Sequence, residues 1–160
     1  MAEGDVFDQE EAVHGHVLVV DDVRANRFML ERMLVRMGCS VTSVEDGKSA
    51  LQVAWEQPPD LALIDVMMPG IDGYEVCRRL KADVRTQNTP VIMVTALSEI
   101  EDIEQAFDAG AMDYVCRPFN PRELAVRVRN ALRLKHQEDR LRLFQAKLSR
   151  ELMLAGVLQE

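Results

Sequence analysis

Four short apolar runs recur along the chain, and each leads directly into polar residues. Residues 17–20, 61–64 and 91–94 are apolar without interruption, and a shorter run spans residues 114–116. Such runs are typical of strands buried on both faces of a sheet. The polar residues that follow them are Asp21 and Asp22, Asp65, Thr95 and Arg117. Ligands of an open parallel sheet bind beyond the carboxyl ends of its strands, so the pattern predicts that these side chains meet in one crevice.

Segments with helical spacing separate the apolar runs. Leu30, Met33, Leu34 and Met37 lie at i, i+3, i+4 and i+7 and predict a first helix, which Gly38 ends. A second strand is predicted over residues 41–44. The three helices after it carry apolar residues on one face each: Leu51, Ala54 and Trp55; Val76, Cys77 and Leu80; and Ile100, Ile103 and Phe107.

Capping residues mark where the later helices begin. Asp46 and Asp72 are suited to cap the second and third helices, and Ser98 with Glu101 forms a capping box for the fourth. Asn120, Pro121 and Glu123 predict the start of a fifth helix in the same manner. Strand and helix thus alternate five times, which predicts an α/β fold: a doubly wound parallel sheet covered by helices on both faces.

A heptad pattern continues beyond residue 132. Leu134, Leu141 and Leu148 repeat every seven residues, Phe144 occupies an intervening seam position, and charged residues flank them. This predicts one long helix that leaves the domain and pairs with a second copy as a coiled coil. Gln137 and Glu151 interrupt the seam, so an ordinary sixth helix folded back on the domain is the alternative.

The acidic charge is concentrated at the start of the chain. Residues 1–14 carry five of the acids that give the chain its net charge of −8, and no Lys or Arg. We interpret residues 1–14 as a disordered arm, 15–134 as the main domain and 135–160 as a helical linker. The excess of acidic over basic residues argues against nucleic acid as a direct partner. The absence of an apolar span, together with three unpaired cysteines, predicts a cytoplasmic protein without a membrane partner.

The predicted crevice suits phosphoryl transfer. Asp21, Asp22 and Asp65 offer hard oxygen ligands for Mg²⁺, and a carboxylate held beside a phosphoryl donor can act as the nucleophile. Asp65, alone at the end of its strand, is the better nucleophile, and the Asp21-Asp22 pair is the better metal anchor. Thr95 and Arg117 can stabilise the oxygens of the transferred group. Taken singly, each of these residues is more often structural.

Four segments resemble the receiver domain of bacterial two-component response regulators. They are residues 19–22, 63–73, 94–96 and 109–119, which contain Asp21-Asp22, Asp65, Thr95 and Arg117. The resemblance covers about residues 16–134 and implies a five-stranded flavodoxin-like fold. It also implies phosphorylation of Asp65 by a sensor histidine kinase or phosphotransfer protein, with Mg²⁺ bound by Asp22, Asp65 and the Met67 carbonyl, and by Asp21 through water.

The same resemblance implies a switch. When Asp65 is phosphorylated, Thr95 is expected to move toward the new oxygens and Tyr114 to turn inward. The surface of the fourth helix, fifth strand and fifth helix would then change. Residues 148–159 resemble, over a short stretch, the helical linkers that precede phosphatase output domains in some response regulators, and helical linkers also precede diguanylate cyclase domains.

Two alternatives follow from departures from these patterns. The family usually has Lys where this chain has Arg117, and guanidinium and ammonium groups are not interchangeable. A degenerate receiver that serves as an adaptor or dimerisation module is therefore the first alternative. The second is a haloacid-dehalogenase-type phosphatase, which requires an acid two residues after the nucleophile, where this chain has Met67.

Overall fold

The computed structural model describes residues 13–157. Most of the predicted arm, residues 1–12, and the end of the linker, residues 158–160, lie outside this range. The strands are β1 (His16–Val20), β2 (Ser40–Val44), β3 (Leu61–Ile64), β4 (Val91–Thr95) and β5 (Asp113–Cys116). The helices are α1 (Arg24–Arg36), α2 (Gly47–Glu56), α3 (Gly73–Ala82), α4 (Ile100–Asp108) and α5 (Pro121–Leu154).

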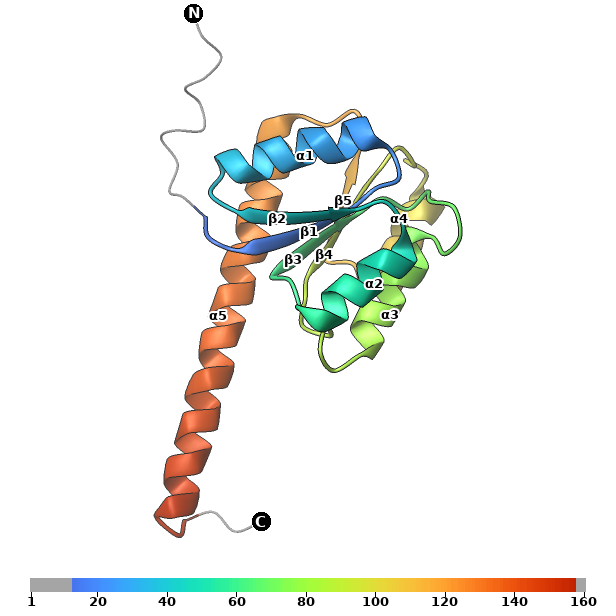
Figure 1. Ribbon diagram of the computed structural model, residues 1–160. Helices are drawn as coiled ribbons and strands as arrows, with labels where there is room; N and C mark the ends of the chain where they lie inside the picture. Colours follow the sequence, from blue (N-terminus) through green and yellow to red (C-terminus); the bar gives the residue numbers. More distant parts are fainter. Residues whose placement is uncertain (1–12, 158–160) are drawn as a thin grey trace, which may run out of the picture.

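All five strands are parallel and lie in the order β2-β1-β3-β4-β5, which confirms the doubly wound α/β fold. Helices α1 and α5 cover one face of the sheet, and α2, α3 and α4 cover the other (Figure 1). Side chains alternate between the faces along each strand. Val17 and Val19 of β1 therefore pack with α1 and α5, whereas Leu18 and Val20 pack with α2 and α3.

Most of the predicted helix starts agree with the structure. The Asp46 and Asp72 carboxylates accept hydrogen bonds from the backbone N–H groups of Ser49 (2.7 Å) and Glu75 (2.9 Å), as N-caps do. Asn120 caps α5 through the N–H of Arg122 at 2.9 Å.

The fourth helix departs from the prediction in its cap. Its capping box consists of Glu99 and Asp102, with the Glu99 N–H donating to Asp102 at 3.3 Å, and not of Ser98 and Glu101. Both pairs have the required spacing, and the loop after β4 places the helix start one residue later. The shared face of Ile100 and Phe107 is mostly exposed, while Ala106 is the buried residue of the helix.

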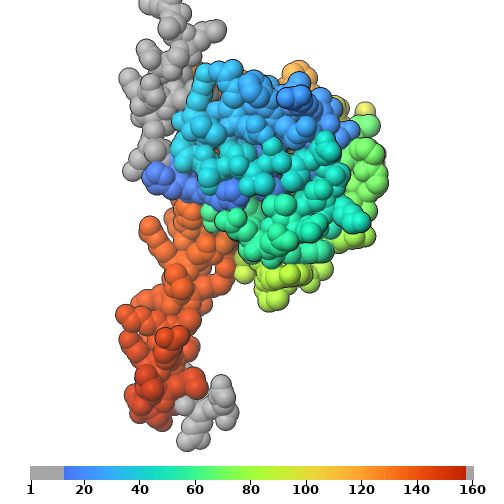
Figure 2. Space-filling model, in the orientation of Figure 1, coloured from blue at the N-terminus to red at the C-terminus, as the bar shows by residue number. Residues whose placement is uncertain are grey.

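Helix α5 belongs to the domain core at one end and projects from it at the other. Its first part buries five residues against the sheet: Leu124, Ala125, Val128, Ala131 and Leu132. The same helix continues without a break to Leu154 and extends away from the body (Figures 1 and 2). The alternative of a separate sixth helix folded back on the domain is therefore wrong.

The projecting part of α5 carries ion pairs and unpartnered apolar residues. Lys135 pairs with Asp139 at 2.6 Å, and Arg142 pairs with Glu138 at 3.2 Å, spacings that support a solvated helix. The seam residues named above remain exposed in the single chain: Leu134, Leu141, Phe144 and Leu148. Among the described residues, no helix combines the length and the apolar character that a membrane crossing requires.

Gly73, the first residue of α3, packs directly on the backbone that carries Asp65. A Cβ atom at position 73 would lie 2.3 Å from the carbonyl oxygen of Asp65 and 2.8 Å from the Cα of Val66. Neither backbone atom can move without shifting the end of β3. The nearby Gly70 differs, because its surroundings are open and its φ is +82°.

Gly73→Ala should therefore lower the free energy of unfolding by roughly 2–3 kcal/mol through overpacking. Gly70→Ala is the matched control and should cost about 1 kcal/mol, because only its left-handed backbone conformation is strained. Urea denaturation of both variants measures the difference. Equal costs would show that the contact between Gly73 and Asp65 is not tight.

Candidate functional site

The sheet register brings the predicted polar residues to one edge. Val20 pairs with Ile64, so Asp21 and Asp65 follow neighbouring positions on β1 and β3. The backbone N–H of Asp65 donates to the Val20 carbonyl at 2.9 Å, which fixes this alignment. Thr95 ends β4, and its carbonyl accepts from the Arg117 N–H at 2.8 Å. Four strand ends thus converge on one crevice.

Three carboxylates meet there. One oxygen from each of Asp21, Asp22 and Asp65 lies within 4.8 Å of the others, the only such grouping of possible metal ligands that residues 13–157 contain. Asp21 and Asp65 are buried, whereas Asp22 faces solvent. This donor set, all oxygen and partly open, is the kind that Mg²⁺ prefers in proteins.

Arg117 lies across two of these carboxylates. Its Nη2 donates to Asp21 at 2.6 Å, and its Nη1 donates to Asp65 at 3.5 Å. The side chain is only 14% exposed, so these charges interact in a partly desolvated setting. The Arg117 Nε–H is buried and has no acceptor within the described part of the chain. The Arg117–Pro118 peptide bond is cis.

Thr95 and Tyr114 frame the neighbouring loop. The Thr95 side chain is fully buried, and its hydroxyl accepts a hydrogen bond from the Leu97 N–H at 3.4 Å. The Tyr114 hydroxyl donates to the Leu97 carbonyl at 2.5 Å, and burial raises the pKa of this phenol. Tyr114 is thus already half-buried and joined to the loop that follows Thr95.

The electrostatics of the crevice raise the pKa of Asp65. Burial raises the pKa of its carboxyl group, and the neighbouring charge of Asp21 adds to this effect. Hydrogen bonds from the Thr95 hydroxyl and the Met67 N–H, together with the positive charge of Arg117, oppose the rise only in part. The ionised form of Asp65 therefore costs free energy in the folded protein when no further cation is bound.

The structure brings together nearly all the residues named from the sequence. Asp21, Asp22, Asp65 and Arg117 converge, and Thr95 adjoins them. The backbone of Met67 also adjoins them, because its N–H donates to Asp65 at 3.2 Å, although the residue as a whole is 58% exposed.

Sequence reasoning missed two features of the site. The first is the ion pair between Asp21 and Arg117, residues 96 positions apart. The second is the packing of Gly73 against the Asp65 backbone. For Gly73, the signal was available: a glycine where an ordinary helix start needs none.

Comparison with known proteins gives the family. The sequence model of the response regulator receiver domain matches residues 17–129. The response regulator PleD of Caulobacter vibrioides is 41% identical over 140 residues, which cover 88% of this chain and 31% of that protein. The transcriptional regulator RpaA of Synechocystis is 41% identical over 117 residues, covering 73% and 48%. The chain belongs to the response regulator receiver domain family.

Solved structures agree with this assignment. A putative response regulator from Chloroflexus aurantiacus superimposes with a TM-score of 0.71 at 40% identity, over 74% of this chain and 97% of that one. The receiver domain of the sensor histidine kinase PA1611 from Pseudomonas aeruginosa, solved with magnesium in its active site cleft, gives 0.70 at 33% identity, over 74% and 98%. The chain spans only about a third to a half of the curated relatives named above.

Asp65→Asn should stabilise the metal-free protein at neutral pH by about 1 kcal/mol, because it removes a buried charge. The folded state binds the Asp65 proton more tightly than the unfolded state does. Stability is therefore lost as the pH rises from the unfolded pKa through the raised folded pKa. The advantage of the variant should shrink as the pH falls through that range, which urea denaturation at several pH values measures.

Asp83→Asn is a control whose effect on stability should have the opposite sign. Hydrogen bonds from Arg85 lower the pKa of Asp83 to about 2. Removing this carboxylate should therefore destabilise the protein at neutral pH, and the loss should fade as the pH drops toward that value. If both variants changed stability in the same direction at pH 7, the account of Asp65 would be wrong.

Proposed function

We propose that the chain is a phosphorylatable receiver whose acceptor is Asp65. The observation that carries this proposal is the convergence of three carboxylates, a buried threonine and an arginine at the ends of four strands. The donor class is a phosphohistidine on a sensor histidine kinase or phosphotransfer protein, in the cytoplasm. Membership of the receiver family and the magnesium-bound relative support the assignment.

The transfer is a single displacement. A carboxylate oxygen of Asp65 attacks the phosphorus, the new O–P bond forms, and the N–P bond of the donor histidine breaks. The leaving imidazole nitrogen keeps the electron pair and takes up a proton. Asp65 must be ionised to attack, so its raised pKa means that positive charge near the site favours the reactive form.

Mg²⁺ fits the residues present. Asp22 and Asp65 would hold it directly, with the Met67 carbonyl, and Asp21 would act through water. When bound, it would supply the positive charge that offsets the mutual repulsion of the acids and the charge of the phosphoryl oxygens. Asp22 is the exposed member of the three.

Arg117 stands where the family usually has lysine. The contacts of its guanidinium favour retained phosphorylation of Asp65. Its guanidinium already contacts both Asp21 and Asp65, and its buried Nε–H remains to be paired. A phosphoryl group on Asp65 would offer acceptors to these donors. The alternative, a degenerate receiver acting as an adaptor, would leave the carboxylate cluster without a use.

The proposed switch begins at Thr95. Movement of its hydroxyl toward the phosphoryl oxygens would break its bond with the Leu97 N–H and displace the Leu97 carbonyl that holds Tyr114. Because Tyr114 lies on β5 beside α4, its change of position would alter the exposed surface that contains Ile100 and Phe107.

The proposed output element is the projecting part of α5. It would pair with a second copy through Leu134, Leu141, Phe144 and Leu148 and connect to an output domain. The relatives' greater length supports a further domain in proteins of this kind. The heptad spacing and the exposure of these side chains support the pairing.

Incubation with acetyl phosphate and Mg²⁺ should add one phosphoryl group per chain, read by intact-protein mass spectrometry. Asp65→Ala should abolish the gain, and so should chelation of the metal. Asp108→Ala, which removes an exposed acid of α4, is the matched control and should react normally. A folded wild-type protein that took up no phosphoryl group would contradict the proposal and favour the degenerate receiver.

Leu141→Ser tests the helix pairing. Loss of a buried leucine from both chains should raise the dissociation constant of the dimer by at least about tenfold. Leu143→Ser is the matched control, because Leu143 is 72% exposed but lies off the seam. Sedimentation equilibrium measures both constants. A monomeric wild-type protein, or equal effects of the two variants, would contradict the pairing.

A further inference from the structure

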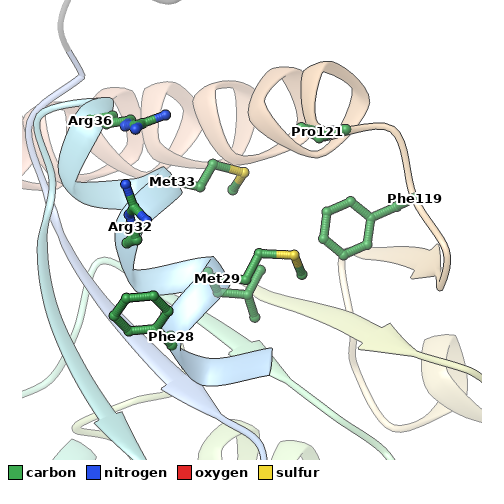
Figure 3. Close-up of a pocket in the computed structure, with 8 residues that line it drawn as sticks. Phe28, Met29, Arg32, Met33, Arg36, Phe119 and Pro121 are labelled. Carbon is green, nitrogen blue, oxygen red and sulfur yellow. The ribbon is translucent and has the colours of Figure 1, made fainter. Parts of the chain in front are cut away.

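A groove separate from the carboxylate site runs between α1 and the start of α5 (Figure 3). Its volume of about 410 Å³ lies within the range of natural binding sites. The lining residues are Phe28, Met29, Leu30, Met33, Phe119 and Pro121, with Arg32 and Arg36. Phe28 is 58% and Met29 46% exposed, so apolar surface here faces water. A segment that buried this surface would be favoured.

The charges beside the groove are positive. Helix α1 contains four arginines and one acid, Glu31, hence a net charge of +3 in a chain of net charge −8. Glu31 accepts a hydrogen bond from Ser43 on β2, and Arg27 donates to the Asp21 carbonyl at 2.7 Å. Arg32 and Arg36 therefore define the charge of the groove, with Arg32 lying 5.6 Å from the ring centroid of Phe28. The matching occupant is acidic with an apolar centre.

We propose that residues 1–12 of the same chain occupy this groove. They contain five acids, no Lys or Arg, and the apolar pair Val6-Phe7 at their centre. The Phe7 ring would lie among the apolar residues of the groove, and the acids would face Arg32 and Arg36. The acidic arm would thereby act as an intramolecular cover for α1.

The point where the arm joins the domain places it at one end of the groove. The Val13 N–H donates to the Met37 carbonyl at 3.1 Å, and Val13 packs against the cluster that contains Leu34 and Met37. Met37 directly follows Arg36, which lines the groove. Val13, where the arm joins the domain, is therefore attached next to Arg36, one of the two arginines that line the groove.

The arm is also long enough. From Met37 to Phe28 the helix spans nine residues, or about 14 Å at 1.5 Å per residue. The six residues from Val13 to Phe7 reach about 20 Å when extended. A tether of this length holds the arm near the groove at a local concentration on the order of millimolar, so even a weak contact would be well populated.

Two measurements on the full chain test the proposal. With ¹³C-methyl methionine, Phe7→Ser should shift the Met29 and Met33 resonances and leave those of Met67 and Met153 in place. Cleavage after Glu10 or Glu11 by a glutamate-specific protease should be at least about fivefold faster in Phe7→Ser and in Arg32→Glu/Arg36→Glu than in the wild type. High salt should accelerate wild-type cleavage, because it screens the charge pairs.

Arg150→Glu, on the far end of α5, is the matched control and should leave the cleavage rate unchanged. Equal rates in all variants, with unmoved methyl resonances, would overturn the proposal. Shifts that grow with protein concentration would also overturn it, because they would place the arm on a second copy. Neither readout uses a phosphoryl donor, so the result is independent of the function proposed above.

Discussion

The site depends on the mutual repulsion of three carboxylates and on the cation that balances it. Asp21, Asp22 and Asp65 bring their oxygens within 4.8 Å of one another, two of them away from water. Arg117 offsets part of this negative charge, because its guanidinium contacts both Asp21 and Asp65. Because Arg117 follows the edge strand β5 and the acids follow β1 and β3, the balance exists only when the sheet is complete. Any cation or phosphoryl group that enters must adjust to this arginine.

The same loop links the charged crevice to the long helix. Only three residues separate Arg117 from Pro121, where α5 begins. The first part of α5 is buried against the sheet, and the remainder is one continuous helix in solvent. A shift of the helix start would therefore be carried along a stiff element and not absorbed by a flexible joint. The proposed coupling of the site to an output element through α5 would have this physical basis.

Predictions from local sequence succeeded where the determining interactions are local. Asp46 and Asp72 cap the helices they precede, and the uninterrupted apolar runs are the buried strands. The fourth helix shows the limit, because two residue pairs could form its capping box. Its spacing placed Ile100 and Phe107 on one apolar face, yet the packing leaves both largely exposed and buries Ala106 instead.

The sequence alone determined the order of strands and helices and the convergence of acids at strand ends, because these follow from hydrophobic period and from the geometry of parallel sheets. The family was indicated by the resemblance of four sequence segments to receiver domains. Tertiary structure decided the rest. It set the contact between Arg117 and Asp21, which are 96 positions apart in the sequence, and the close packing of Gly73 on the Asp65 backbone. It also formed the groove between α1 and α5. Each depends on side-chain directions and on the docking of distant elements, which no local pattern encodes.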